Sequence, residues 1–295
     1  MQKEIVCDAS YREGYAKKFS DKYPHNEVGI IGRSILGRDI HYYKIGTGKK
    51  SIVAVGAHHG MEYITSTALY DFLDYICENA TRGSVFCGVN LEFLLQRFTF
   101  WVIPCLNPDG VELCLHGIEK TPLYERQLRM NLSSTDFSRW QANARGVDLN
   151  HNYDAGFNEY KHVEEQNRIL PGRTRYSGEY PESEPETKSL AGFIRALGPV
   201  AVISLHTQGE EIFFKPESDY VKRICERLAG RIGYEVSSPE GSARYGGLSD
   251  YTGDVLGIPS FTLELGRGEN PLPSTSLQGI CDTVRKFLVI LPTHL

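Results

Sequence analysis

The sequence predicts an α/β protein, a single domain with three layers in which helices cover both faces of a mixed, mostly parallel sheet. Three apolar, β-branched runs carry this prediction, because each has the length and composition of a buried strand: Ser51–Ala57, Phe98–Cys105 and Pro199–Leu205. Segments with helical spacing lie between them, and such alternation is typical of a sheet covered on both sides. With 295 residues, of which 41% are hydrophobic, the chain is long enough to bury a large core.

The N-terminal elements are expected in the following order. A short helix is expected over Tyr11–Phe19, and the segment Glu27–Gly37 then leads through glycine and arginine to Asp39–Gly46. Residues Asp39–Gly46 have no clean apolar face, so they are predicted to form an edge strand. The strand Ser51–Ala57 then leads into a helix whose apolar stripe predicts an end near Asn79.

The rest of the chain continues this alternation. Asn90–Arg97 is predicted to be a helix, Asn107–Gly110 a turn, and the polar segment Ser133–Arg145 a loop. In Ser183–Leu197, a serine followed three residues later by a glutamate predicts a helix that opens with a capping box. The remaining elements are, in order, a helix, a strand and a closing helix: Tyr220–Ile232, Pro259–Leu265 and Thr283–Leu291.

Charge and cysteine content exclude several classes of protein. The net charge of −5 and the pI near 6.0 argue against nucleic acid as a partner, because phosphate binding needs a basic surface. Seven cysteines without a CxxC pair argue against a cysteine metal site and favour reduced thiols. No run has signal-peptide or membrane-spanning length, so we expect no membrane partner and a cytoplasmic location.

Four side chains are expected at the carboxyl ends of strands, where open α/β sheets bind ligands. His59 and Glu62 lie three residues apart after a strand, His206 ends another, and Glu264 lies near the end of a third. Each has an ordinary explanation alone, such as a helix-opening glutamate, a hydrogen-bonded histidine or an ion pair of Glu264 with Arg267. Imidazole and carboxylate are ligands that zinc accepts, and a carboxylate in an apolar strand is costly unless it is paired or functional. Their shared placement therefore favours a metal site.

At these residues the sequence resembles the zinc metallocarboxypeptidases of the carboxypeptidase A/T type. The resemblance runs from about Gly37 to about Leu291 and implies a carboxypeptidase-like fold. It implies one zinc ion per chain, bound by His59, Glu62 and His206, with Glu264 as the general base. It also implies an N-terminal extension, residues 1–36, packed on a zinc peptidase catalytic domain of residues 37–295. The matching motifs are HxxE, the Asn-Pro-Asp-Gly turn, GVD-x-N-x-N, the Ser-Glu-Pro-Glu-Thr helix opening, SLH and FTLEL.

Two arginines of the family pattern are absent. The Asn-Arg pair that binds a C-terminal carboxylate in the family is replaced by Asn150 and His151. A histidine lacks the bidentate fork that arginine offers to a carboxylate. The oxyanion arginine of the family is replaced by Gln141, and Arg139 and Arg145 are candidates to take over its role.

The expected specificity pocket is polar. Its base falls on Ser249, followed by Asp250, while Tyr245 lies near the position of the family's mobile tyrosine. These residues, with Arg267 in the run Gly266–Pro273, resemble the bacterial γ-D-glutamyl-(L)-meso-diaminopimelate peptidases, which cut cell-wall (murein) peptides. The resemblance implies a small muropeptide substrate and suits muropeptide turnover or sporulation.

Three other functions remain open at this stage. One is an ordinary metallocarboxypeptidase that removes C-terminal residues from α-peptides, and an arginine supplied from elsewhere in the chain to bind the C-terminal carboxylate would favour it. A zinc amidohydrolase of small acyl amino acids would share the metal chemistry, although the peptidase-like motifs count against it. A catalytically inactive module that binds wall peptides is a third possibility, and the intact Glu264 argues against it.

Overall fold

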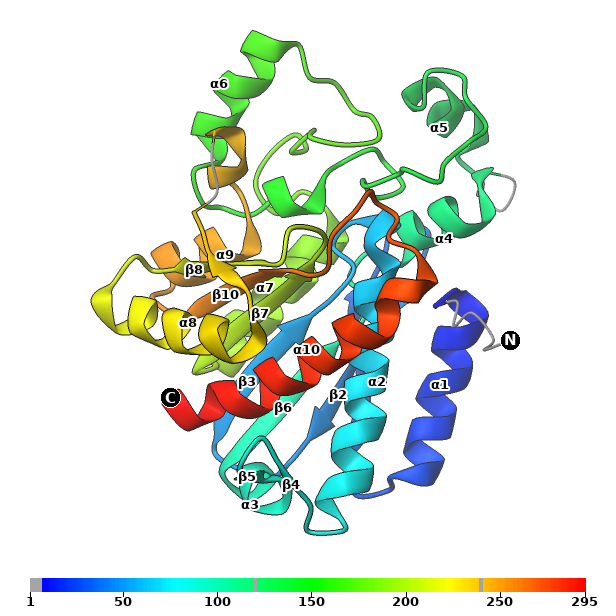
Figure 1. Ribbon diagram of the computed structural model, residues 1–295. Helices are drawn as coiled ribbons and strands as arrows, with labels where there is room; N and C mark the ends of the chain where they lie inside the picture. Colours follow the sequence, from blue (N-terminus) through cyan, green and yellow to red (C-terminus); the bar gives the residue numbers. More distant parts are fainter. Residues whose placement is uncertain (1–6, 119–120, 239–240) are drawn as a thin grey trace.

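An eight-stranded sheet runs through the protein in the order β1-β2-β6-β3-β7-β10-β8-β9 (Figure 1). The computed structural model describes residues 7–118, 121–238 and 241–295. A separate two-stranded hairpin consists of β4 and β5. The strands are β1 (Glu27–Arg33), β2 (Asp39–Ile45), β3 (Lys50–Val55), β4 (Val85–Phe86), β5 (Val89–Asn90), β6 (Phe98–Ile103), β7 (Ala201–His206), β8 (Glu211–Lys215), β9 (Glu235–Val236) and β10 (Ser260–Glu264).

The centre of the sheet is parallel, as the apolar runs predict. Strands β6, β3, β7 and β10 are parallel neighbours, whereas β1, β2 and β8 join the sheet in antiparallel pairs. Parallel strands place their carboxyl ends at one edge, and the register there pairs Glu264 of β10 with His206 of β7. The predicted mixed, mostly parallel sheet is confirmed.

Helices cover both faces of this sheet and complete the predicted three layers. Helices α1 (Ala9–Lys22), α2 (Tyr63–Ala80), α8 (Asp219–Ile232) and α10 (Leu277–Ile290) contribute buried side chains to the larger apolar core on one face. Helix α7 (Pro185–Leu197) packs on the other face. The remaining helices of the described residues are α3 (Leu91–Arg97), α4 (Pro108–His116), α5 (Tyr124–Met130), α6 (Phe157–Asn167) and the single-turn α9 (Leu248–Asp250).

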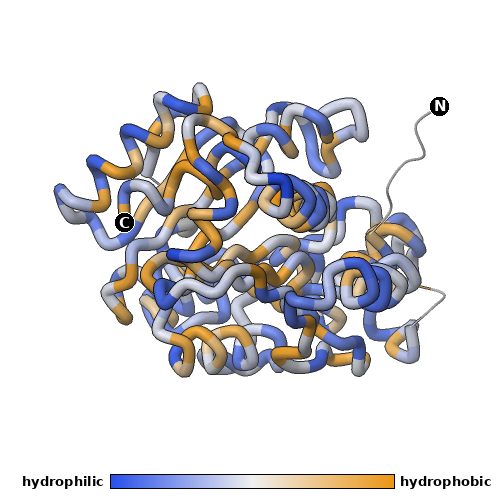
Figure 2. The backbone as a smooth tube through the Cα atoms, turned by 90° about the horizontal axis from the view of Figure 1, so that it is seen from below, coloured by the Kyte–Doolittle hydropathy of each residue, from blue (hydrophilic) through white to orange (hydrophobic). Residues whose placement is uncertain are grey.

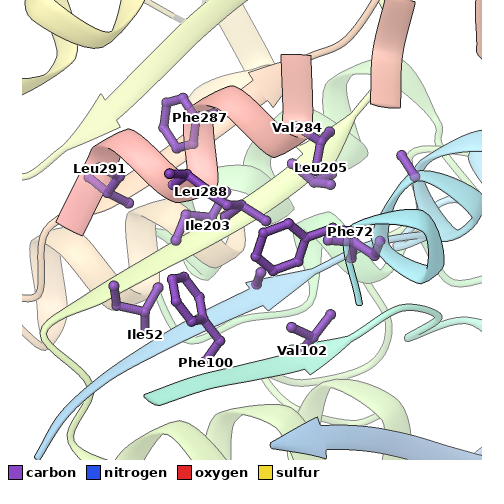
Figure 3. Packing of buried hydrophobic residues seen from close by; sticks show 14 of the residues in the cluster. Ile52, Phe72, Phe100, Val102, Ile203, Leu205, Val284, Phe287, Leu288 and Leu291 are labelled. Atoms are coloured by element: carbon purple, nitrogen blue, oxygen red, sulfur yellow. The ribbon is translucent and has the colours of Figure 1, made fainter. Parts of the chain in front are cut away.

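The larger core lies between α2, α10 and the parallel strands. In Figure 3, Phe72 from α2 and Leu288 from α10 point toward the strands that carry Ile203 and Phe100, and all four side chains are fully buried. Figure 2 shows hydrophobic and hydrophilic residues alternating along the helices, as expected for helices with one face on a sheet. No helix among the described residues is long and apolar enough to cross a membrane.

The segment Asp39–Ile45 corrects one expectation, because β2 is an internal strand. It pairs with β1 on one side and with β6 on the other, so β1 forms the edge of the sheet. Both faces of β2 are covered: Tyr43 and Ile45 enter the larger core, and Ile40 enters the core under α7. Tyrosine rings supply apolar surface that a simple count of aliphatic residues misses.

Two helix starts also differ from the sequence prediction. The Asn-Pro-Asp-Gly segment opens α4, with Asn107 as its N-cap, whose Oδ1 accepts the N–H of Gly110 at 2.9 Å. The predicted capping box at the start of α7 is wrong, because the helix has Glu184 at its N-cap position and no side chain caps it. Ser183 instead hydrogen-bonds to Asn152 across 2.9 Å.

The domain boundary at residue 37 stays a prediction. Upstream of it, α1 packs Tyr15 and Phe19 against Tyr43 of β2, with ring centroids 5.5 and 5.1 Å apart. The strand β1 is hydrogen-bonded to β2 across the predicted boundary. The N-terminal residues that the structure describes are therefore continuous with the core.

Candidate active site

Three side chains that are remote in sequence converge at the carboxyl edge of the parallel strands. The ligand atoms of His59, Glu62 and His206 lie within 4.8 Å of one another, and all three residues are buried. Glu62 lies between the two rings, 2.8 Å from Nδ1 of His59 and 3.1 Å from Nδ1 of His206. Two imidazoles and one carboxylate are a donor set that fits zinc and leaves one coordination position open. The arrangement is able to hold one metal ion.

The loop after β3 positions the first two of these side chains. A single 3-10 turn, η1 (Gly60–Glu62), follows His59 and turns Glu62 back toward it. Thr65 fixes the turn, because its hydroxyl accepts the N–H of Ala57 at 2.9 Å and donates to the carbonyl of Glu62 at 2.7 Å. A Cβ on Gly60 would lie 2.4 Å from the carbonyl oxygen of Gly110, so only glycine allows α4 to approach this closely.

The outer nitrogen of each histidine is also occupied. Nε2 of His59 lies 3.1 Å from Oδ1 of Asp148, and Nε2 of His206 lies 3.0 Å from Oγ of Ser204. These contacts direct both Nδ1 atoms toward Glu62. Such outer partners fix the orientation of a ligating histidine and raise its basicity.

The sequence pattern does not reveal the role of Asp148, although the residue lies in the GVD-x-N-x-N segment. Burial alone would raise the pKa of its carboxyl, but His59 beside it holds that pKa well below its usual range. Its second oxygen accepts the backbone N–H of Arg175 at 3.0 Å. Asp148 is therefore an ionised carboxylate that links the candidate metal site to a distant loop.

Glu264 lies at the end of β10, beside the three converging side chains. It is half-buried, and within the described residues its carboxylate makes no hydrogen bond or ion pair. Burial and then the nearby charge of Glu62 raise the pKa of Glu264, while His59 lowers it. A carboxyl group that shares a site with a metal-binding cluster and has no fixed partner is suited to accept and return a proton.

His58, which precedes His59, has different partners. Its Nε2 lies 3.1 Å from the hydroxyl of Tyr153, and its Nδ1 lies 3.5 Å from Oγ of Ser204. Burial, together with the neighbouring histidines, lowers the pKa of His58 well below its usual value. The side chain is thus a neutral, hydrogen-bonded residue behind the cluster.

The comparison with protein families decides the identity of this site. Residues 13–286, nearly the whole chain, match the family model described as zinc carboxypeptidase. The chain belongs to the zinc carboxypeptidase family. Together with the His-Glu-His cluster, this membership makes the protein a zinc metallopeptidase, and the predicted enzyme class and cofactor are confirmed.

Individual members of the family are similar over most of this chain. Gamma-D-glutamyl-L-diamino acid endopeptidase 1 of Lysinibacillus sphaericus is 32% identical over 90% of this chain and 66% of its own length. Uncharacterized protein YqgT of Bacillus subtilis is 31% identical over 92% of this chain and 73% of its own length. The structure of bovine thrombin-activatable fibrinolysis inhibitor in complex with tick carboxypeptidase inhibitor aligns with a TM-score of 0.76 at 19% identity, over 98% of this chain and 97% of that chain. This last likeness confirms the carboxypeptidase fold.

Among the substrate-binding residues expected from the zinc carboxypeptidase pattern, Asn150 and His151 lie on one 3-10 turn after Asp148. Oδ1 of Asn150 accepts the N–H of Leu248 at 3.1 Å. His151 donates from Nδ1 to the carbonyl of Tyr245 at 2.8 Å, and burial lowers its pKa. His151 is therefore a neutral ring with one nitrogen already bound, which is unlike the free guanidinium of the family.

The predicted pocket base lies on α9. Ser249 is half-buried, and Asp250 is buried with its Oδ2 accepting the N–H of Gly247 at 3.1 Å. Burial raises the pKa of Asp250 to about 7, and Lys215, whose Nζ lies 3.9 Å from Oδ1, partly offsets this rise. Asp250 thus already has partners within the chain, and its predicted contact with substrate would compete with them.

The three arginines predicted to serve this zinc carboxypeptidase are exposed and paired with carboxylates. The separations are 2.8 Å for Arg139–Glu269, 3.8 Å for Arg145–Glu184 and 2.7 Å for Arg267–Glu210. Exposed pairs such as Arg139–Glu269 and Arg267–Glu210 stabilise a fold by only about 0–1 kcal/mol, so they can open when a ligand arrives, whereas Glu184 is buried. Their roles in substrate binding stay predictions.

Proposed function

We propose that the protein hydrolyses the γ-D-glutamyl–meso-diaminopimelate bond of murein peptides. The observation that carries this proposal is the state of position 151. An arginine there would bind the C-terminal carboxylate of an α-peptide through two parallel hydrogen bonds. His151 is neutral, stacked on Tyr160 and bound to Tyr245, so this side chain is itself a poor partner for an ordinary peptide C-terminus. The 32% identity to a protein named gamma-D-glutamyl-L-diamino acid endopeptidase supports the same substrate class.

In the proposed mechanism, His59, Glu62 and His206 would hold the zinc ion, and the contact with Asp148 would keep His59 in the ligating orientation. A bound zinc ion lowers the pKa of a water molecule and polarises the scissile carbonyl. Glu264 accepts the proton of that water and returns it to the leaving amine. Because its carboxylate has no fixed partner among the described residues, this proton transfer breaks no existing hydrogen bond.

The polar pocket is part of the same proposal. Diaminopimelate carries a second amino-acid centre, with an ammonium and a carboxylate, at the far end of its side chain. Asp250 of α9 and Lys215 of β8 place opposite charges close together. A zwitterionic group needs one partner of each sign, and Ser249, Asp250 and Arg267 with Tyr245 remain the residues that we propose to meet it.

An ordinary metallocarboxypeptidase is the alternative function. Asn150 favours it, because its Oδ1 accepts the N–H of Leu248 and its amide group, which makes no hydrogen bond within the described residues, can donate to a substrate carboxylate. A reducing, cytoplasmic location belongs to our proposal and is supported by seven free thiols, one of them, Cys87, exposed.

The defined tripeptide L-Ala-γ-D-Glu-meso-diaminopimelate tests the proposal. Mass spectrometry should detect release of meso-diaminopimelate by the purified enzyme. The values of kcat/KM are then compared for this tripeptide, for its lysine analogue and for a dipeptide that ends in phenylalanine. The lysine analogue lacks the distal carboxylate and should react more slowly, because an unpaired buried polar group costs about 1–3 kcal/mol. A clear preference for the phenylalanine dipeptide would refute the proposed substrate and favour the alternative.

A further inference from the structure

The backbone of Arg175 is fixed beside the candidate metal site. Its N–H donates to Oδ2 of Asp148 at 3.0 Å, while Oδ1 of the same carboxylate lies 3.1 Å from Nε2 of His59. Its carbonyl accepts the hydroxyl of Tyr160 at 2.7 Å. The residue has φ near +70°, a left-handed conformation that costs a non-glycine residue about 1–3 kcal/mol and persists only where surrounding contacts hold it.

The guanidinium of Arg175 is exposed and available. Within the described parts of the chain it makes no hydrogen bond or ion pair, in contrast to Arg139, Arg145 and Arg267, which all face carboxylates. The backbone of Arg175 lies on the side of the site where His151 lies, because Tyr160, which donates to its carbonyl, stacks on His151. Burial raises the pKa of Tyr160, and the positive charge of Arg175 partly offsets that rise. The ring of Tyr160 in turn stacks on His151 with the centroids 4.0 Å apart.

The segment that contains Arg175 also contacts Gln141, the second position at which a positive charge is absent. Thr174 donates its hydroxyl to Oε1 of Gln141, and the carbonyl of Arg173 accepts the N–H of Gln141 at 3.0 Å. Gln141 and His151 are both neutral at this edge of the site. An arginine on the segment that contacts both Gln141 and, through Tyr160, His151 has a charge that neither of these residues provides.

We infer that Arg175 binds a carboxylate on the diaminopimelate side of the substrate, an inference that rests on the proposed function. A guanidinium can engage a carboxylate through two hydrogen bonds at once. The fixed left-handed backbone determines where the side chain leaves the loop. The hydrogen bond to Asp148 places that point within two hydrogen bonds of His59. Arg175 is thus a substrate-binding residue that the sequence pattern does not reveal.

The variant R175N tests this assignment, because asparagine tolerates the left-handed conformation and removes the charge. The matched control is R173N, which removes an exposed arginine from the same loop while leaving its backbone carbonyl bonded to Gln141. Each enzyme is assayed on the tripeptide and on the same tripeptide with both diaminopimelate carboxylates converted to amides. Zinc content and thermal unfolding are measured for every variant.

R175N should lower kcat/KM for the acid substrate by about 10- to 100-fold, mainly through KM, because hydrogen bonds between charged groups are the strong ones. It should leave the amide substrate, the zinc content and the unfolding temperature near those of the wild type, and R173N should change little. An equal loss on both substrates, a loss of zinc, or an equal loss in R173N would overturn the inference. If the wild type cuts only the phenylalanine dipeptide, the proposed function fails; the same variants on that dipeptide and its C-terminal amide still decide the role of Arg175.

Discussion

Replacing Asp148 with asparagine should weaken zinc binding, although Asp148 lies outside the three-residue cluster. One carboxylate oxygen is 3.1 Å from Nε2 of His59, and the other accepts the N–H of Arg175 at 3.0 Å. Asparagine has one oxygen acceptor and one NH2 donor in place of the two carboxylate oxygens. Either Nε2 of His59 or the N–H of Arg175 must therefore face the NH2 group. Either His59 loses its acceptor or the loop at Arg175 moves away from the site.

The size of the effect follows from these contacts. Loss of a partner that orients a ligating histidine typically weakens metal binding by about 10- to 100-fold, which is about 1.4–2.7 kcal/mol. Asp148 is buried and ionised, and His59 is the main cause of its lowered pKa. The variant removes this charge as well as the hydrogen bond, so we expect a value in the upper part of that range.

Competition for zinc with a chelator at neutral pH measures the affinity of D148N. The control is D109N, which also removes a buried carboxylate. Asp109 pairs with Arg38 at 2.6 Å and with the N–H of Leu36 at 2.9 Å. D109N should lower the unfolding temperature and keep the zinc affinity. Wild-type affinity in D148N, or an equal loss in both variants, would refute the orienting role of Asp148.

Three further predictions concern the buried ionisable groups. E264Q should bind zinc and unfold like the wild type but lose about 10²–10⁴-fold in kcat, because glutamine cannot accept the proton; a rate near that of the wild type would remove Glu264 from the mechanism. H206A should be purified without zinc and H58A with it, as metal analysis would show, and equal zinc in both would contradict the ligand assignment. Burial raises the pKa of Glu186 to about 8 from its ordinary 4.5, so the folded state retains a proton that the unfolded state releases. The stability of the wild type should therefore fall as pH rises from about 5 to about 8. In E186Q, the unfolding temperature should lack this dependence on pH. An equal dependence of the unfolding temperature on pH in the wild type and in E186Q would disprove the prediction.

Elements that depend on local pattern were predictable from the sequence. The three apolar runs form β3, β6 and β7, and the stripe that follows the first run forms α2. Elements whose formation depends on distant partners were not predictable from the sequence. Helix α4 was predicted as a turn, because Pro108 and Gly110 suit both a turn and the first positions of a helix. Strand β8 has only five residues, of which Ile212 is fully buried, and it lies between its antiparallel partner β10 and the two-residue strand β9.

The candidate active site shows the same difference between residues placed by local pattern and residues placed by distant contacts. The spacing of His59 and Glu62 is local, and the end of a parallel strand carries His206 to the same edge, so the cluster can be found from sequence. Asp148 and Arg175 gain their significance from a contact between two loops 27 residues apart. Nothing in the composition of either loop requires that contact.

Position 151 shows the consequence for predicting specificity. A missing arginine at one position is evidence about substrate only if no other segment brings a positive charge to the same place, because a carboxylate responds to where the charge lies in space. The backbone carbonyl of Arg175 accepts the hydroxyl of Tyr160, whose ring stacks on His151, and the adjacent Thr174 donates to Gln141. The substrate comparison establishes which peptide is cut, and the R175N comparison establishes which charge recognises it. A preference for diaminopimelate that persists in R175N would assign the selectivity to the pocket of Ser249 and Asp250 instead.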